Sequence, residues 1–276
     1  MSSLTKYEDE QVRKIREWKG KEPSVVSKKF GKVVTPVNWL VQKVIPPAAI
    51  RGAIDAANST GKWLSDTGDI KRNGKISEIR ELRDKDLELS DKLTDSVHNW
   101  AIGMATVEGA ATGFGGILLI AVDIPAIVTL AMRTIHKIGL CYGYESLDEN
   151  DNQFILGILA ASGANSVAEK VAALTTLRSI EVTIAKQTWK AMAEKAAEQQ
   201  ISKEGAIIAI KNLAKQIGIN ITKRKALQAI PIIGALVGGF VNGWYIKDIG
   251  WAAHRAFQER WLIDNQKILE IRFNHI

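Results

Sequence analysis

Five ionisable residues lie in or beside the most apolar stretches of the chain, and they are its candidates for chemistry: Asp123, Arg133, His136, Asp248 and Arg255. Within a membrane, an ionisable group in an apolar run is a functional hypothesis by default. In water, Asp123 has a plainer role, because an aspartate shortly before a proline is a typical helix N-cap. Asp248 and Arg255 share a helix face two turns apart, which predicts a structural ion pair unless they line a cavity.

The residue types argue against several kinds of site. The four histidines lack metal-binding spacing, and a single cysteine, Cys141, disfavours structural zinc. No G-x-S-x-G motif occurs, and Gly113-Phe114-Gly115-Gly116 lacks the strand and third glycine of a dinucleotide-binding turn. We therefore predict no catalytic residue, no metal and no cofactor. An enzyme with an unfamiliar helical site near Asp123, His136 and Asp248 stays open as an alternative.

Two apolar stretches must position these side chains, residues 101–144 and residues 226–246. Small residues four apart let helix backbones approach closely, whereas each glycine costs about 1 kcal/mol of helix propensity relative to alanine. We expect close packing to offset that cost at eight glycines: Gly109, Gly113, Gly115, Gly116, Gly234, Gly238, Gly239 and Gly243. The second stretch is uncharged and just reaches the roughly 20 residues that cross a bilayer.

Amphipathic helical patterns fill most of the remaining chain, and no segment alternates as a strand would. The sequence therefore predicts an all-α fold, a multi-helix bundle built around the two glycine-rich stretches. A charged N-terminal helix within residues 1–23 precedes a single domain over 24–276. The Gly- and Asn-rich residues 65–80 predict a polar connector inside that domain.

Two helix boundaries follow from the same signals. Asp123 predicts the start of a helix that ends at Gly139 or Gly143. The last helix is predicted to begin at Lys247 and to continue to about Arg272.

Residues 24–45 form a basic amphipathic pattern with two interpretations. Lysine, phenylalanine and tryptophan together are typical of a helix on a membrane surface, which makes five residues candidates for membrane contact: Lys28, Lys29, Phe30, Lys32 and Trp39. The plainer interpretation is a helix that covers the core and leaves its lysines in water.

The net charge of +7 favours an anionic partner, either lipid headgroups or nucleic acid. Nucleic acid is the weaker choice, because no nucleic-acid module is present and no aromatic residues alternate with the basic run at 223–225. The charged N-terminus has no apolar core of a secretory signal. We expect a cytoplasmic protein, or one at the cytoplasmic face of the inner membrane.

Three stretches of the sequence carry a resemblance to a known family. The first contains G-F-G-G-I, A-V-D-I-P-A-I, R-T-I-H-K-I and C-Y-G-Y within residues 113–144, and the second is A-I-P-I-I-G-A-L-V-G-G-F-V-N at 229–242. The third is the tail D-I-G-W-A-A-H-R-A-F-Q-E-R-W-L at 248–262. Together these stretches resemble the EcsC family of bacterial proteins. The resemblance implies a helical protein without an established molecular activity, linked to transport or the cell envelope by the namesake's neighbouring ABC transporter genes. It brings no catalytic residues.

These patterns predict a membrane-associated helical protein, peripheral or conditionally inserting. The alternative is a soluble helical interaction or scaffold protein, in which both apolar stretches form only the core. The sequence thus leaves a lipid surface and a protein as the candidate partners.

Overall fold

The structure is a computed structural model that describes residues 3–21, 66–113, 116–145, 149–162 and 234–269. Every regular element in these ranges is a helix, and none of the described residues lies in a strand. The predicted all-α fold is therefore confirmed. The basic segment 24–45 lies outside the described residues.

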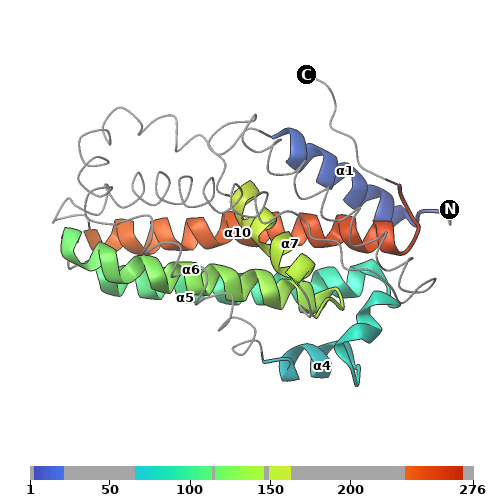
Figure 1. Cartoon of the computed structure of the whole chain (residues 1–276), viewed down its shortest axis with the longest axis horizontal. Helices are drawn as coiled ribbons and strands as arrows, with labels where there is room; N and C mark the ends of the chain where they lie inside the picture. Colours follow the sequence, from blue (N-terminus) through green and yellow to red (C-terminus); the bar gives the residue numbers. More distant parts are fainter. Residues whose placement is uncertain (1–2, 22–65, 114–115, 146–148, 163–233, 270–276) are drawn as a thin grey trace.

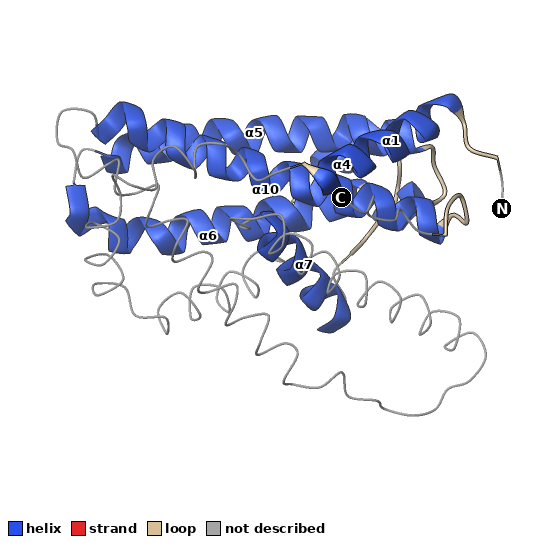
Figure 2. Ribbon diagram, turned by 90° about the horizontal axis from the view of Figure 1, so that it is seen from above, coloured by secondary structure: helices blue, strands red, loops and turns tan. Residues whose placement is uncertain are grey.

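Three long helices run side by side along the molecule in both views (Figures 1 and 2). They are α5 (Leu87–Gly113), α6 (Gly116–Cys141) and α10 (Gly234–Asp264). Helix α10 is antiparallel to α5, because Gly243 packs on Thr106 while Trp261, farther along α10, hydrogen-bonds Leu82, ahead of α5. Helix α6 turns back from α5 after two residues. The end of α5 therefore lies beside the starts of α6 and α10.

Two shorter helices cover this bundle. Helix α1 (Lys6–Gly20) begins with a capping box made by Thr5 and Glu8, and its far end is held to α10 by a buried Lys19–Glu259 ion pair of 2.6 Å. Helix α7 (Glu149–Ser162) packs Phe154 edge-on against Phe257 of α10, with 5.1 Å between ring centroids.

The polar segment 65–80 contains more structure than a connector. It includes helix α4 (Gly68–Gly74) and the start of a 3-10 helix (Ile79–Arg83). Its three isoleucines, Ile70, Ile76 and Ile79, are at most 8% exposed and belong to the main core. Single isoleucines spaced among glycine and charged residues give no periodic signal in the sequence. Burial of each isoleucine nevertheless stabilises the segment against the core.

Both predicted helix starts were wrong, and for the same reason. Helix α6 begins at Gly116, so Asp123 and Pro125 lie inside it and Asp123 is not its N-cap. Helix α10 continues through Lys247 to Asp264 without a break. In each case tertiary packing extends the helix across a local start signal, because most helix stability in proteins comes from burying a face rather than from propensity.

The predicted end of α6 was right at Gly143. This glycine has a φ of +82°, and its N–H donates to the carbonyl of Leu140 while Tyr144 donates to the carbonyl of Gly139. These two bonds form a Schellman cap, which needs a residue in the left-handed region. The side chain and backbone of Arg83 lie where a Cβ on Gly143 would have to fit.

Helices α5 and α10 approach so closely that small residues are required between them. A Cβ at Gly250 would collide with the imidazole of His98, which is held by a 3.0 Å hydrogen bond to the carbonyl of Lys247. Burial lowers the pKa of His98 to about 4, so its ring is neutral and can pack here. A Cβ at Gly243 would likewise collide with Thr106.

Gly243 is the one among the eight predicted packing glycines whose surroundings are described. The structure places Gly109 and Gly113 in the last turns of α5 and Gly116 at the start of α6. The three others in α10 lie in its first two turns, at 234, 238 and 239. Gly115 lies outside the described residues.

The α5–α10 contact gives a prediction about stability. We expect Gly250→Ala to lower the free energy of unfolding by about 1–3 kcal/mol, because the added methyl overpacks the site against His98. The control is Gly103→Ala in the facing helix α5, where nothing lies within 4 Å of the added Cβ. That change should raise stability by about 0.5–1 kcal/mol. Urea denaturation measures both; equal effects would contradict the close approach.

Candidate functional site

The structure separates the residues predicted as one alternative enzyme site. Asp123 and His136 lie thirteen residues apart on the continuous helix α6, which is about 20 Å along its axis at ~1.5 Å per residue. They cannot act on one reacting atom. His136 is buried, Asp248 is half-buried on α10, and the side chain of Asp123 lies outside the described part.

A buried carboxylate, Asp91 of α5, organises the polar part of the core instead. Its side chain is 4% exposed, and it accepts hydrogen bonds from four groups. Tyr142 donates to Oδ1 at 2.6 Å, while Tyr7 and Gln258 each donate to Oδ2 at 2.7 Å. The Nε2 of His254 lies 3.3 Å from Oδ1. These donors come from α1, the turn after α6 and α10, so one carboxylate joins three segments to α5.

An arginine balances the charge of this cluster. Arg255, predicted as a functional candidate, donates to Gln258 at 2.5 Å and to Gln11 of α1 at 3.1 Å. Its guanidinium also lies 5.1 Å from the centroid of the Trp251 ring. The predicted pairing of Arg255 with Asp248 stays a prediction. The cluster thus links Asp91, through Gln258, to Arg255 by hydrogen bonds.

The electrostatics of the cluster favour a structural role. An ionised carboxylate has about four acceptor positions, and four donors fill those of Asp91. Burial, followed by the negative charge of Asp91, raises the pKa of Tyr142 well above its usual value. Burial and the hydrogen bond to Asp91 raise the pKa of Tyr7 in the same way. Both tyrosines therefore stay protonated donors, and no acceptor position is left for a general base.

Sequence reasoning missed Asp91, although a signal was present. Six residues of α5 recur at alternating spacings of four and three and are all buried: Leu87, Asp91, Thr94, His98, Ala101 and Ala105. This is the seam that faces α10. A charged residue inside a regular buried seam indicates a specific polar partner, because an unpaired charge there would be costly.

The C-Y-G-Y motif at 141–144 also has a structural explanation. Tyr144 donates to Asp264 at the end of α10 at 2.7 Å. The guanidinium of Arg260 lies 4.1 Å from the centroid of its ring, and that of Arg83 lies 4.8 Å from it. Each tyrosine of the motif thus carries a carboxylate partner, Asp91 for Tyr142 and Asp264 for Tyr144.

The other end of the bundle is nearly uncharged. Residues 99–132 contain two charged side chains, Glu108 and Asp123, and residues 234–246 contain none. The antiparallel arrangement brings these segments together where α5 ends and α6 and α10 begin (Figure 1). We call this region the uncharged end. No helix among the described residues is long and apolar enough to cross a bilayer.

An apolar stripe on α5 leads into the uncharged end. Trp100 and Met104 are each 45% exposed, and Val107 is 70% exposed. Spacings of four and three residues put them on one helix face. Arg133 of α6, another predicted candidate, lies with its guanidinium 5.0 Å from the Trp100 ring centroid. The predicted membrane-contact residues of 24–45 lie outside the described residues.

Replacing Asp91 tests its structural role. We expect Asp91→Asn to lower the free energy of unfolding by about 3 kcal/mol, because the amide turns a donor toward groups that themselves donate. The control is Glu88→Gln on the exposed face of the same helix, where Glu88 pairs with Lys92. That pair should contribute under about 1 kcal/mol. Urea denaturation of both variants measures the two free energies of unfolding. An Asp91→Asn variant as stable as the wild type would show that the cluster does not stabilise the fold.

The comparisons with known proteins agree on one family. "Uncharacterized protein YdbA" of Bacillus subtilis (strain 168) is 24% identical over 257 residues, 90% of this chain and 82% of the relative. "Protein EcsC" of the same organism is 22% identical over 157 residues, 57% of each chain. No solved structure matches the chain. The model of the EcsC protein family matches residues 9–262, nearly the whole length, so the protein belongs to the EcsC protein family.

Proposed function

We propose that this protein is a peripheral membrane protein that attaches through the uncharged end of its α5–α6–α10 bundle. The observation that carries the proposal is the apolar stripe of Trp100, Met104 and Val107, exposed beside that end. Soluble monomers seldom leave a large contiguous apolar surface in water, so such a surface indicates a contact with a membrane or a protein.

The composition of the stripe favours lipid over protein. Tryptophan concentrates at bilayer interfaces, and an arginine beside it can keep its charge among headgroups while its stem lies on apolar surface. The pair formed by Trp100 and Arg133 has this arrangement. Trp100 and Val107 lie seven residues apart, about 10 Å along the helix axis, so the stripe covers two turns of one helix face.

The charge of the whole chain adds to this attachment. A net charge of +7 favours anionic lipid, which is enriched on the cytoplasmic leaflet. We therefore place the protein at the cytoplasmic face of the membrane. The role in transport or the cell envelope that the family resemblance implies would be exercised there, and the polar Asp91 half of the bundle would face the cytoplasm.

Flotation with liposomes tests the proposal. We expect the protein to float with vesicles that contain anionic lipid, and Val107→Glu to reduce the bound fraction at least about tenfold. Burying a valine contributes about 1.5 kcal/mol, and the new carboxylate opposes burial.

The matched control is Leu269→Glu, because Leu269 is 74% exposed but lies beyond the opposite end of α10. It should float like the wild type. The proposal fails if the wild-type protein stays at the bottom of the gradient with and without anionic lipid, or if both variants lose binding equally. A monodisperse complex with another protein through the same stripe would support the scaffold alternative.

A further inference from the structure

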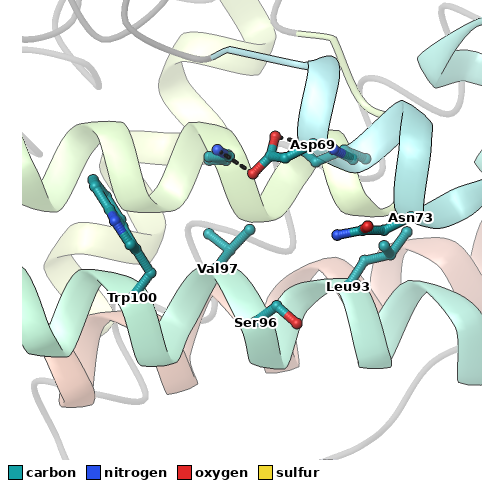
Figure 3. Close-up of a pocket in the computed structure, with 8 residues that line it drawn as sticks. Asp69, Asn73, Leu93, Ser96, Val97 and Trp100 are labelled. Carbon is teal, nitrogen blue, oxygen red and sulfur yellow. Dashed lines mark hydrogen bonds and ion pairs between the residues drawn. The ribbon is translucent and has the colours of Figure 1, made fainter.

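A cavity of about 140 Å³ lies between α4, α5 and α6, beside the apolar stripe (Figure 3). Helix α4 contributes Asp69 and Asn73, α5 contributes Ser96 and Trp100, and α6 contributes Lys137. Trp100 belongs both to the cavity wall and to the exposed stripe. The cavity therefore opens at the boundary between the uncharged end and the charged part of the molecule.

The cavity presents opposite charges side by side. The ammonium of Lys137 donates to Oδ2 of Asp69 at 2.7 Å, and its side chain is only 11% exposed. An ammonium has three donors, so this bond leaves two of them for another acceptor. The side chain of Asp69 is 39% exposed, so its carboxylate remains accessible to a second cation.

A second cation lies one turn away on α6. Arg133 stacks over Trp100, and its Nε is buried without a hydrogen-bond partner. A buried donor left unpaired is costly, and an acceptor from a ligand would relieve that cost. Arg133 and Lys137 are four residues apart, so both face the same side of α6. Lys137 lines the cavity, and Arg133 borders it through its contact with the Trp100 ring.

We propose that this cavity binds an aminoalkyl phosphate, the zwitterionic headgroup of an aminophospholipid. The phosphate would lie between Lys137 and Arg133, and the ammonium group would lie against Asp69 and the face of Trp100. A purely anionic group would be repelled by Asp69, and a simple amine would be repelled by the two cations. A zwitterion is complementary to both, and an ammonium over an aromatic ring is itself favourable.

The position of the cavity agrees with a lipid as the source, and in this respect the inference rests on the proposed function. When the stripe of Trp100, Met104 and Val107 lies in the acyl boundary, the cavity beside Trp100 lies at headgroup depth. Asn73 and Ser96 add neutral hydrogen-bonding groups at its wall. A soluble aminoalkyl phosphate has the same chemistry, so the test must distinguish the two sources.

The first test uses soluble probes and calorimetry on the full chain. Glycerophosphoethanolamine should bind at least about tenfold more tightly than either glycerol phosphate or ethanolamine, because each of these lacks one charge-assisted contact. Ser96→Phe fills the cavity without removing a member of the Lys137–Asp69 pair, and it should abolish binding. Equal binding of the three probes, or binding unchanged in Ser96→Phe, would overturn the proposal.

The second test separates this site from membrane attachment. Val107→Glu should lose flotation but still bind glycerophosphoethanolamine. Ser96→Phe should float normally on phosphatidylglycerol vesicles. When phosphatidylethanolamine replaces part of the phosphatidylglycerol, the wild-type protein should bind more tightly, whereas Ser96→Phe should show no such gain. A wild-type protein that binds the soluble probe but shows no such gain would assign the site to a free aminoalkyl phosphate. If neither the probe nor the lipid binds, the headgroup proposal fails while attachment through the stripe still stands.

Discussion

The close approach of α5 and α10 is the constraint on which the rest of the structure depends. Gly250 lies under the ring of His98 and Gly243 lies against Thr106, so the two backbones come closer than larger side chains would allow. This contact aligns the two helices along most of their length. It therefore decides which residues of α10 reach Asp91, and it brings the uncharged start of α10 to the end of α5, where Glu108 is the one charged residue after residue 99.

The same alignment divides the bundle into two parts with different chemistry. In one part, a buried carboxylate with four donors and a buried Lys19–Glu259 pair hold α1, α5 and α10 together. Such groups need defined partners, so they specify one arrangement of the helices. The other part has almost no charge and exposes Trp100, Met104 and Val107. The proposed membrane attachment rests on this division between a half with defined polar partners and an end with an exposed apolar surface.

The sequence predicted the presence of the helices better than their boundaries or the contacts of their side chains. Helical periodicity and the lack of strand alternation predicted the helical class. Gly143 predicted the end of α6, because a Schellman cap depends on local residues. The signals at Asp123 and Lys247 were also local, but burial of the continuous helices overrode them. The seam pointed to Asp91, but its partner Tyr142 and the contact of Arg255 with Gln11 could not be predicted, because these pairs lie 51 and 244 residues apart in the chain. Ile70, Ile76 and Ile79 were missed since isolated apolar residues show no period.

A cysteine cross-link between α5 and α10 tests the central claim most directly. A Cβ at position 243 would lie 3.6 Å from the Cβ of Thr106, within the 3.5–4.5 Å range of disulfides. In a Cys141→Ser background, Thr106→Cys with Gly243→Cys should form an intramolecular disulfide under mild oxidation. Val107→Cys with Gly243→Cys should not, because the side chain of Val107 projects into solvent. Equal cross-linking of the two pairs, or none in the first, would contradict the alignment that brings the uncharged segments together.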